Sequence, residues 1–152
     1  MLKKLALISL LTVFCIFIIS YGKHSTKIND NSPYEIKQIN GLTLKIKKII
    51  ELPKTKETEH KLLKITIEGS NTSPNPQSFD AMQVTVKNSA NKSLDIYPSD
   101  SFGEMLGSGK TAEGEVFFSI EGKVLPAKVL YENPDTQEKI EWEIKSIQKD
   151  DK

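Results

Sequence analysis

Residues 63–68 read Leu-Lys-Ile-Thr-Ile-Glu, so an apolar side chain alternates with a polar one along the whole stretch. A period of two residues places successive side chains on opposite faces of the backbone, which is the pattern of a strand with one buried and one solvated face. Isoleucine and threonine are β-branched and favour strands. The stretch therefore predicts a strand, and the same period recurs along the rest of the chain.

The alternation extends on both sides of this strand. Upstream, apolar residues from Leu42 to Leu52 lie on even positions, including Ile50, while Lys45 and Lys47 face the other way. Downstream strands are predicted at Met82–Val86, at Leu94–Tyr97 (returning as a hairpin), at Val116–Ile120, at Ala127–Tyr131 and at Ile140–Ile144.

Turn residues separate these strands, notably Asn40-Gly41, the run 69–76 and Asn133-Pro134-Asp135. Trp142 is in phase with its apolar neighbours, and we expect it to anchor the core. About seven short strands without an amphipathic helix predict an all-β fold. The expected fold is an immunoglobulin-like antiparallel β-sandwich, preceded by an N-terminal hydrophobic export segment.

The first 22 residues have the pattern of an export signal. Lys3 and Lys4 precede an apolar run over positions 5–19, and small residues at Ser20 and Gly22 predict cleavage after Gly22. The run is shorter than the roughly 20 residues that a spanning helix needs. An uncleaved membrane anchor remains an alternative, as does a lipoprotein through Cys15.

The predicted organisation follows from this leader. Residues 1–22 are a signal peptide or membrane anchor, 23–34 a polar spacer, 35–148 the β-sandwich and 149–152 a solvated tail. We expect the protein to be exported, and either secreted or anchored to the outer face of the cytoplasmic membrane.

The charge balance restricts the partners that the protein can bind. All 21 basic residues are lysine, they face 20 acidic residues, and the net charge is +1. Nucleic-acid binding needs several unopposed cations, so it is not expected. Without arginine the chain has no planar guanidinium group that could bind a phosphate or carboxylate through two hydrogen bonds. We expect no cofactor.

Several stretches resemble a known family. These are Gly41-Leu-Thr-Leu-Lys-Ile-Lys, Leu63 to Asn71-Thr-Ser, the Met82–Tyr97 stretch, Gly109 to Phe118, and Leu125-Pro-Ala-Lys-Val-Leu-Tyr131. Together they resemble the telokin-like, immunoglobulin-like extracellular domains of exported Gram-positive bacterial proteins, a family classed as a domain of unknown function. The resemblance implies a sandwich fold and an exported location, and it transfers no catalytic residues.

The sequence shows no pattern typical of a catalytic site, a metal site or a phosphate-binding loop. His24 and His60 are the two histidines, too few for the usual zinc sites, and no catalytic or metal residues are predicted. Gly107 to Thr111 matches only the end of a phosphate-binding loop, because Glu104 stands where that motif needs glycine. Loop acids and amides could form at most a calcium site, and no EF-hand spacing is present.

The sequence therefore favours a non-enzymatic interaction or accessory module at the bacterial cell envelope, with an unknown protein or envelope component as its partner. Membrane contact is expected only through an uncleaved N-terminal segment. The candidate interaction loops lie within 69–80 and 98–110, because loops carry function on such scaffolds. Their candidate residues are Ser73, Pro74, Asn75, Pro76, Asp100, Phe102 and Glu104. The alternative is an extracellular protease inhibitor of the β-sandwich type, with Ser73–Pro76 as its proline-braced inhibitory loop.

Overall fold

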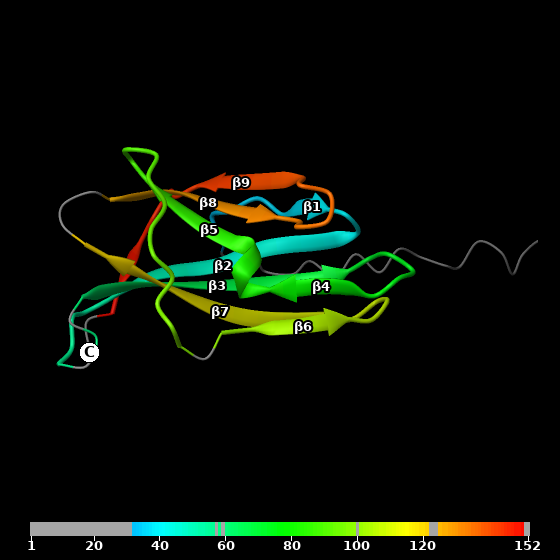
Figure 1. The fold of residues 1–152 in the computed structure, drawn as a ribbon, viewed down its shortest axis with the longest axis horizontal. Helices are drawn as coiled ribbons and strands as arrows, with labels where there is room; N and C mark the ends of the chain where they lie inside the picture. Colours follow the sequence, from blue (N-terminus) through cyan, green and yellow to red (C-terminus); the bar gives the residue numbers. More distant parts are fainter. Residues whose placement is uncertain (1–31, 57, 59, 100, 122–124, 151–152) are drawn as a thin grey trace, which may run out of the picture. The chain divides into compact units, whose positions relative to one another are not determined.

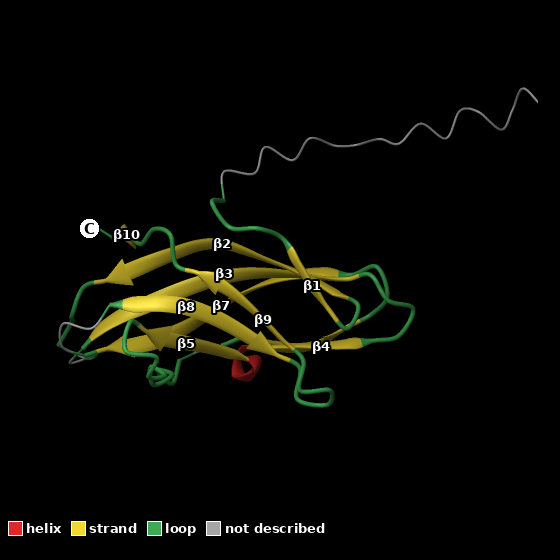
Figure 2. Ribbon diagram, turned by 90° about the horizontal axis from the view of Figure 1, so that it is seen from above, coloured by secondary structure: helices red, strands yellow, loops and turns green. Residues whose placement is uncertain are grey.

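The structure, a computed structural model, describes residues 32–150 except 57, 59, 100 and 122–124. The expected leader, its cleavage position after Gly22 and Cys15 lie outside the described residues. The elements are β1 (Lys37–Ile39), β2 (Leu42–Leu52), β3 (Lys61–Asn71), β4 (Gln77–Asp80), the 3-10 turn η1 (Ala81–Gln83), β5 (Val84–Asn88), β6 (Gly103–Leu106), β7 (Thr111–Ile120), β8 (Pro126–Glu132), β9 (Lys139–Glu143) and β10 (Gln148–Lys149), as drawn in Figures 1 and 2.

Two sheets pack against each other through one core. The first has the strand order β1-β2-β3-β7, with β10 parallel to β2, and the second has the order β5-β8-β9. Inward side chains of both sheets, such as Ile65 and Val116 from the first and Val86 and Val129 from the second, are fully buried in a single cluster. Figure 2 shows the two layers from above. The predicted all-β, immunoglobulin-like antiparallel sandwich is confirmed.

A third ladder, β4 with β6, occupies segments that the sequence assigned to turns and connections. Phe79 of β4 packs its ring 4.3 Å from that of Phe102, which directly precedes β6. A Cβ atom at Gly69 would lie 2.8 Å from Phe79, and one at Gly114 would lie 2.2 Å from Phe102. The two glycines of β3 and β7 therefore leave the space in which this aromatic pair sits, and the pair holds the ladder on the first sheet.

The buried face of β2 changes phase at a bulge. The register with β3 shifts between Ile46 and Lys48, which inserts one extra residue into β2. Such a residue moves every following side chain to the opposite face. Ile49 is therefore buried, while Ile50 and Leu52 are only half-buried. The expected placement of these last two on the buried face is wrong, and so is the solvated placement of Lys45, which is buried.

The segment around Met82 is a 3-10 turn instead of a strand. The Asp80 carboxylate accepts a hydrogen bond from the Met82 amide at 2.7 Å, and the Gln83 side chain accepts one from the Asp80 amide at 3.2 Å. This reciprocal cap closes the turn. Met82 is consequently exposed and Gln83 buried, the reverse of the predicted alternation. Gln83 accepts a hydrogen bond from the buried hydroxyl of Tyr131.

The predicted hairpin strand at Leu94–Tyr97 crosses between the sheets. Leu94 still donates to the carbonyl of Val86, but Tyr97 donates to that of Phe117, on the outer edge of β7. The segment forms isolated bridges and no strand of its own.

The first described residues join the core. Tyr34, at the end of the expected spacer, is 5% exposed and donates a hydrogen bond from its hydroxyl to the carbonyl of Ser146 at 2.9 Å. Trp142 of β9 is 3% exposed, which confirms its expected role as a core anchor. No helix in the described part of the chain has the length and hydropathy needed to cross a bilayer.

Candidate functional site

Four turns meet at one end of the sandwich. They are residues 40–41 between β1 and β2, 72–76 between β3 and β4, 107–110 between β6 and β7, and 133–138 between β8 and β9, and we call them the loop end. They lie together on the right of Figure 1. Thr72 donates its amide to the Gly41 carbonyl at 2.7 Å, and the Asn40 side chain donates to the Thr136 hydroxyl at 2.6 Å. Hydrogen bonds therefore join turns that are distant in sequence.

Asn71 is the residue around which the loop end is built. Its side chain is 1% exposed. The amide nitrogen donates to the carbonyls of Asn75 and Leu106, both at 2.8 Å. The carbonyl oxygen accepts from the amide and the hydroxyl of Ser73, also at 2.8 Å. Both donors and both acceptor positions of the side chain are used, so it fixes the loop after β3 and ties that loop to β6.

The predicted residues Ser73, Pro74, Asn75 and Pro76 form the outer part of this loop. The Ser73 hydroxyl oxygen also lies 2.7 Å from the Asn75 carbonyl oxygen, so its one proton is shared between this carbonyl and the Asn71 side chain. Pro74, Asn75 and Pro76 are exposed. The structure thus brings these four residues together on a braced, outward-facing loop.

A tight turn supports this loop from below. Asn40 and Gly41 both have positive φ angles, 46° and 80°, which is the geometry of a two-residue hairpin turn. A Cβ atom at Gly41 would lie only 2.5 Å from the Ser73 Cβ. Glycine is required here both by the backbone conformation and by the close approach of the neighbouring loop.

The remaining predicted residues lie elsewhere. Phe102 packs inward on Phe79 and is not part of the exposed loop surface. Glu104 is exposed on β6. Asp100 falls outside the described residues.

Sequence reasoning missed Asn71 as a site residue. One signal could have identified it: a polar amide occupies an inward position at the end of an alternating strand and is followed at once by Thr-Ser.

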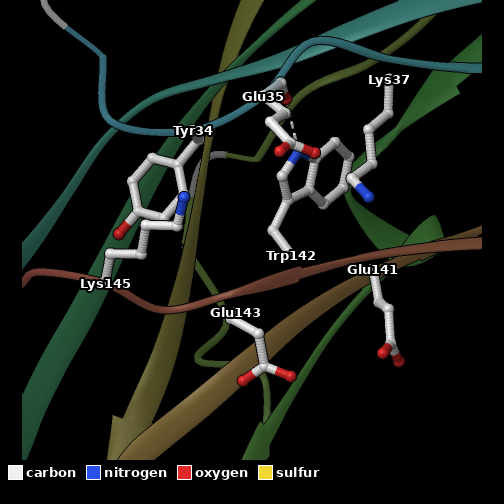
Figure 3. Close-up of a pocket in the computed structure, with 7 residues that line it drawn as sticks. All are labelled: Tyr34, Glu35, Lys37, Glu141, Trp142, Glu143 and Lys145. Carbon is white, nitrogen blue, oxygen red and sulfur yellow. Dashed lines mark hydrogen bonds between the residues drawn. The ribbon is translucent and has the colours of Figure 1, made fainter.

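A groove lies between the N-terminal residues Tyr34–Lys37 and β9. Figure 3 shows this edge groove, a pocket of about 270 Å³ lined by Tyr34, Glu35, Lys37, Glu141, Trp142, Glu143 and Lys145. The Trp142 indole nitrogen donates to the Glu35 carbonyl at 2.8 Å, which fixes the floor of the groove.

One lysine pairs with both acidic residues of β9, which leaves these three side chains with one net negative charge. Lys128 of β8 pairs with the carboxylates of Glu141 at 3.1 Å and Glu143 at 3.3 Å. The hydrogen bond to Glu141 is the largest cause that raises the pKa of Lys128 above its ordinary value. Lys128 is partly exposed and both glutamates are exposed, so the pairing adds little to stability.

In the part of the chain that the structure describes, no three His, Cys, Asp or Glu side chains gather in a way that could hold a metal ion.

Comparison with solved structures places the chain among immunoglobulin-like β-sandwiches. A "putative lipoprotein" of Bacillus subtilis, ycdA, matches with a TM-score of 0.60 at 18% identity, over 73% of this chain and 38% of its own length. The secreted protein MPT63 of Mycobacterium tuberculosis matches with a TM-score of 0.53 at 13% identity, over 72% of this chain and 89% of its own. The yjhA protein of Bacillus subtilis matches with a TM-score of 0.53 at 14% identity, over 76% and 96%.

At such identities the likeness shows the fold alone. The chain spans well under half the length of the Bacillus lipoprotein. No protein-family model and no curated protein matches the chain.

Proposed function

We propose that this chain is a non-enzymatic, exported interaction or accessory module of the bacterial cell envelope, and that it meets its partner through the loop end. The observation that carries the proposal is the buried Asn71 amide. It uses all of its hydrogen-bonding capacity to hold the exposed Ser73–Pro76 loop in one conformation. A loop that is already ordered loses less conformational entropy when it binds.

The chemistry of the loop end suits a protein or other polar partner. Its residues are mostly Asn, Ser, Thr, Gly and Pro, and of these Asn, Ser and Gly supply adaptable hydrogen bonding in natural binding loops. Loops held at one end of a β-sandwich are a common place for recognition, because the sheets position them rigidly.

Export is supported by the N-terminal sequence pattern and by the descriptions of proteins with a similar fold. Lys3 and Lys4 precede an apolar run, and the small residues Ser20 and Gly22 follow it. Two of the similar structures are described as a secreted protein and as a "putative lipoprotein". Membership of the telokin-like family is part of this proposal, and it rests on the strand-and-turn residues that resemble that family. Intact mass of the protein from culture supernatant and from membranes would separate secreted, anchored and lipidated forms, and recovery from the cytoplasm alone would refute export.

A pull-down from envelope extracts tests the loop end. One variant replaces residues 74–76 by a Gly-Ser linker of equal length, which keeps Asn71, its partner Ser73 and the strands in place. The matched control replaces residues 54–56, which lie in the loop between β2 and β3 at the opposite end of the sandwich. The partner should be lost only with the first variant. Equal recovery with both variants would refute the assignment.

A second candidate function is protease inhibition by the same loop. The exposed Pro74-Asn75-Pro76 segment, braced from beneath by Asn71, has the rigidity that such a loop needs. Incubation with a panel of extracellular proteases tests it, and Asn71→Ala should weaken any inhibition by loosening the loop. Rapid cleavage at this loop without loss of protease activity would reject inhibition.

A further inference from the structure

Both methionines of the described residues lie on the surface of the sandwich. Met82 and Met105 are 76% and 65% exposed, and they are two of the five large apolar side chains that the described residues expose. Methionine is otherwise one of the residue types most often found fully buried. The core is built mainly from isoleucine, leucine, valine and aromatic side chains. The two thioethers therefore add little to core packing, and both are open to small solutes.

The local structure fixes this exposure at each position. Met82 lies in the η1 turn, where its amide donates to the Asp80 carboxylate at 2.7 Å and its side chain is turned to solvent. Met105 lies opposite Ser78 in the β4–β6 ladder, on the face away from the buried Leu106 that follows it. Neither methionine belongs to the core cluster of the described residues. A change of polarity at either sulfur therefore removes no core contact.

Two other side chains of types that oxidants attack are buried. Trp142 is 3% exposed and Tyr131 is 1% exposed. The one cysteine of the sequence, Cys15, lies outside the described residues. Oxidation of methionine to its sulfoxide is a common modification, and dedicated reductases reverse it. The two exposed thioethers are thus the groups of the described chain that are best placed to react with a dissolved peroxide.

We propose that Met82 and Met105 form a reversible oxidation site for peroxides. A lone pair of the sulfur attacks one oxygen of hydrogen peroxide, the O–O bond breaks and a sulfur–oxygen bond forms, so the thioether becomes a sulfoxide and the other oxygen leaves as water. The sulfur loses two electrons and the peroxide gains them. A methionine sulfoxide reductase reverses the step with two thiols, which become a disulfide while the sulfoxide oxygen leaves as water.

The modification changes the surface and leaves the core as it is. Met82 lines a pocket of about 260 Å³ beside the apolar residues Val84, Leu94, Ile96 and Phe118. A sulfoxide is polar, whereas the thioether is apolar, so oxidation of Met82 places a hydrogen-bond acceptor at the rim of this pocket. Peroxide therefore switches the polarity of this surface. The inference does not depend on the function proposed for the loop end.

Timed treatment of the full chain with dilute hydrogen peroxide, followed by peptide mapping with mass spectrometry, tests the proposal. Unfolding in urea should speed the oxidation of Met82 and Met105 by less than about threefold, because both are already exposed in the folded chain. The matched control is Leu44→Met, a volume-conserving exchange that puts a thioether at a fully buried position of β2. Unfolding should speed oxidation at position 44 by at least about tenfold, since the core opens only rarely.

Oxidation and repair should both take place in the folded state. Complete oxidation should lower Tm by no more than about 2 °C, the scale of a surface substitution. Retention on a hydrophobic-interaction column should fall when the parent is oxidised and should not change for the double variant Met82→Leu, Met105→Leu. The two stereospecific methionine sulfoxide reductases, supplied with dithiothreitol, should restore the mass and the retention without urea.

Several results would overturn the proposal. A larger acceleration on unfolding at either methionine would show that its side chain is shielded, and equal rates at position 44 in the folded and unfolded control would show that exposure does not govern the reaction. A larger fall in Tm, or oxidation of Trp142 before the methionines, would mean that peroxide damages the core. Sulfoxides that the reductases repair only in urea would show that the site is not reversible.

Discussion

Replacing Asn71 by alanine should destabilise the fold far more than its position beside a surface loop suggests. The substitution removes four hydrogen bonds of 2.8 Å, two of them to Ser73 and one to the carbonyl of Asn75, in a loop that water can reach. The acceptor of the fourth bond, the carbonyl of Leu106, is buried and loses its donor. A net hydrogen bond contributes about 1 kcal/mol, and a buried group left unpaired costs about 1–3 kcal/mol. Asn71→Ala should therefore lower the free energy of unfolding by about 3 kcal/mol.

Urea unfolding followed by far-ultraviolet dichroism measures this loss. The midpoint should fall while the slope with denaturant stays unchanged, and Tm should drop by about 10–15 °C for a domain of this size. Asn75→Ala is the matched control, because Asn75 accepts through its backbone carbonyl and its side chain is exposed. That control should stay within about 0.5 kcal/mol of the parent. A loss below about 1 kcal/mol for Asn71→Ala would refute the idea that this side chain organises the loop end.

Three further changes test the packing described above. Gly114→Ala should lower the free energy of unfolding, measured by urea unfolding, by about 2 kcal/mol, because the new methyl group collides with the Phe102 ring. An unchanged free energy of unfolding would mean that the ring does not pack on β7. Trp142→Phe should cost about 1 kcal/mol through loss of the bond to the Glu35 carbonyl, again by urea unfolding, and a larger stability than the parent would contradict that bond. Burial raises the pKa of Tyr131 above its ordinary value of 10.0, so its neutral form stabilises the fold below pH 10 and this contribution is lost as pH rises further. The parent should lose stability above pH 10 more steeply than Tyr131→Phe, by up to about 1.4 kcal/mol per pH unit, and parallel stability curves would argue against the buried hydroxyl.

Alternation predicted the core well where strands are long and regular. Ile65, Val116 and Trp142 all face inward as their period of two indicates. The bulge in β2 could not be read from the sequence, because no glycine or proline marks the extra residue between Ile46 and Lys48. The short β4–β6 ladder was also hidden, since it joins two segments distant in sequence through four residue pairs.

The turn at Met82 was readable in principle. Asp80 stands three residues before Gln83, which is the spacing of a reciprocal helix cap, but the alternation of Met82 with the following valines masked it. Capping chemistry and strand periodicity compete over such short stretches, and here the local hydrogen bonds prevail.

The candidate site was predicted only in part. The Ser73–Pro76 loop was visible as dense turn chemistry, whereas its brace by Asn71 depends on a contact with Leu106 that no local pattern encodes. The edge groove was not predicted at all. It combines Tyr34 with Trp142, residues from opposite ends of the described chain, and only the folded sheets bring them together.

The proposed function requires the loop end to be the surface that meets a partner. Site-specific photo-crosslinking in living cells tests it most directly, with the photoreactive group at Asn75 and, in a parallel variant, at Lys54 in the exposed loop at the opposite end. A discrete crosslinked product from position 75, missing from position 54, is the predicted result. Identical products from both positions, or none from position 75, would contradict the claim.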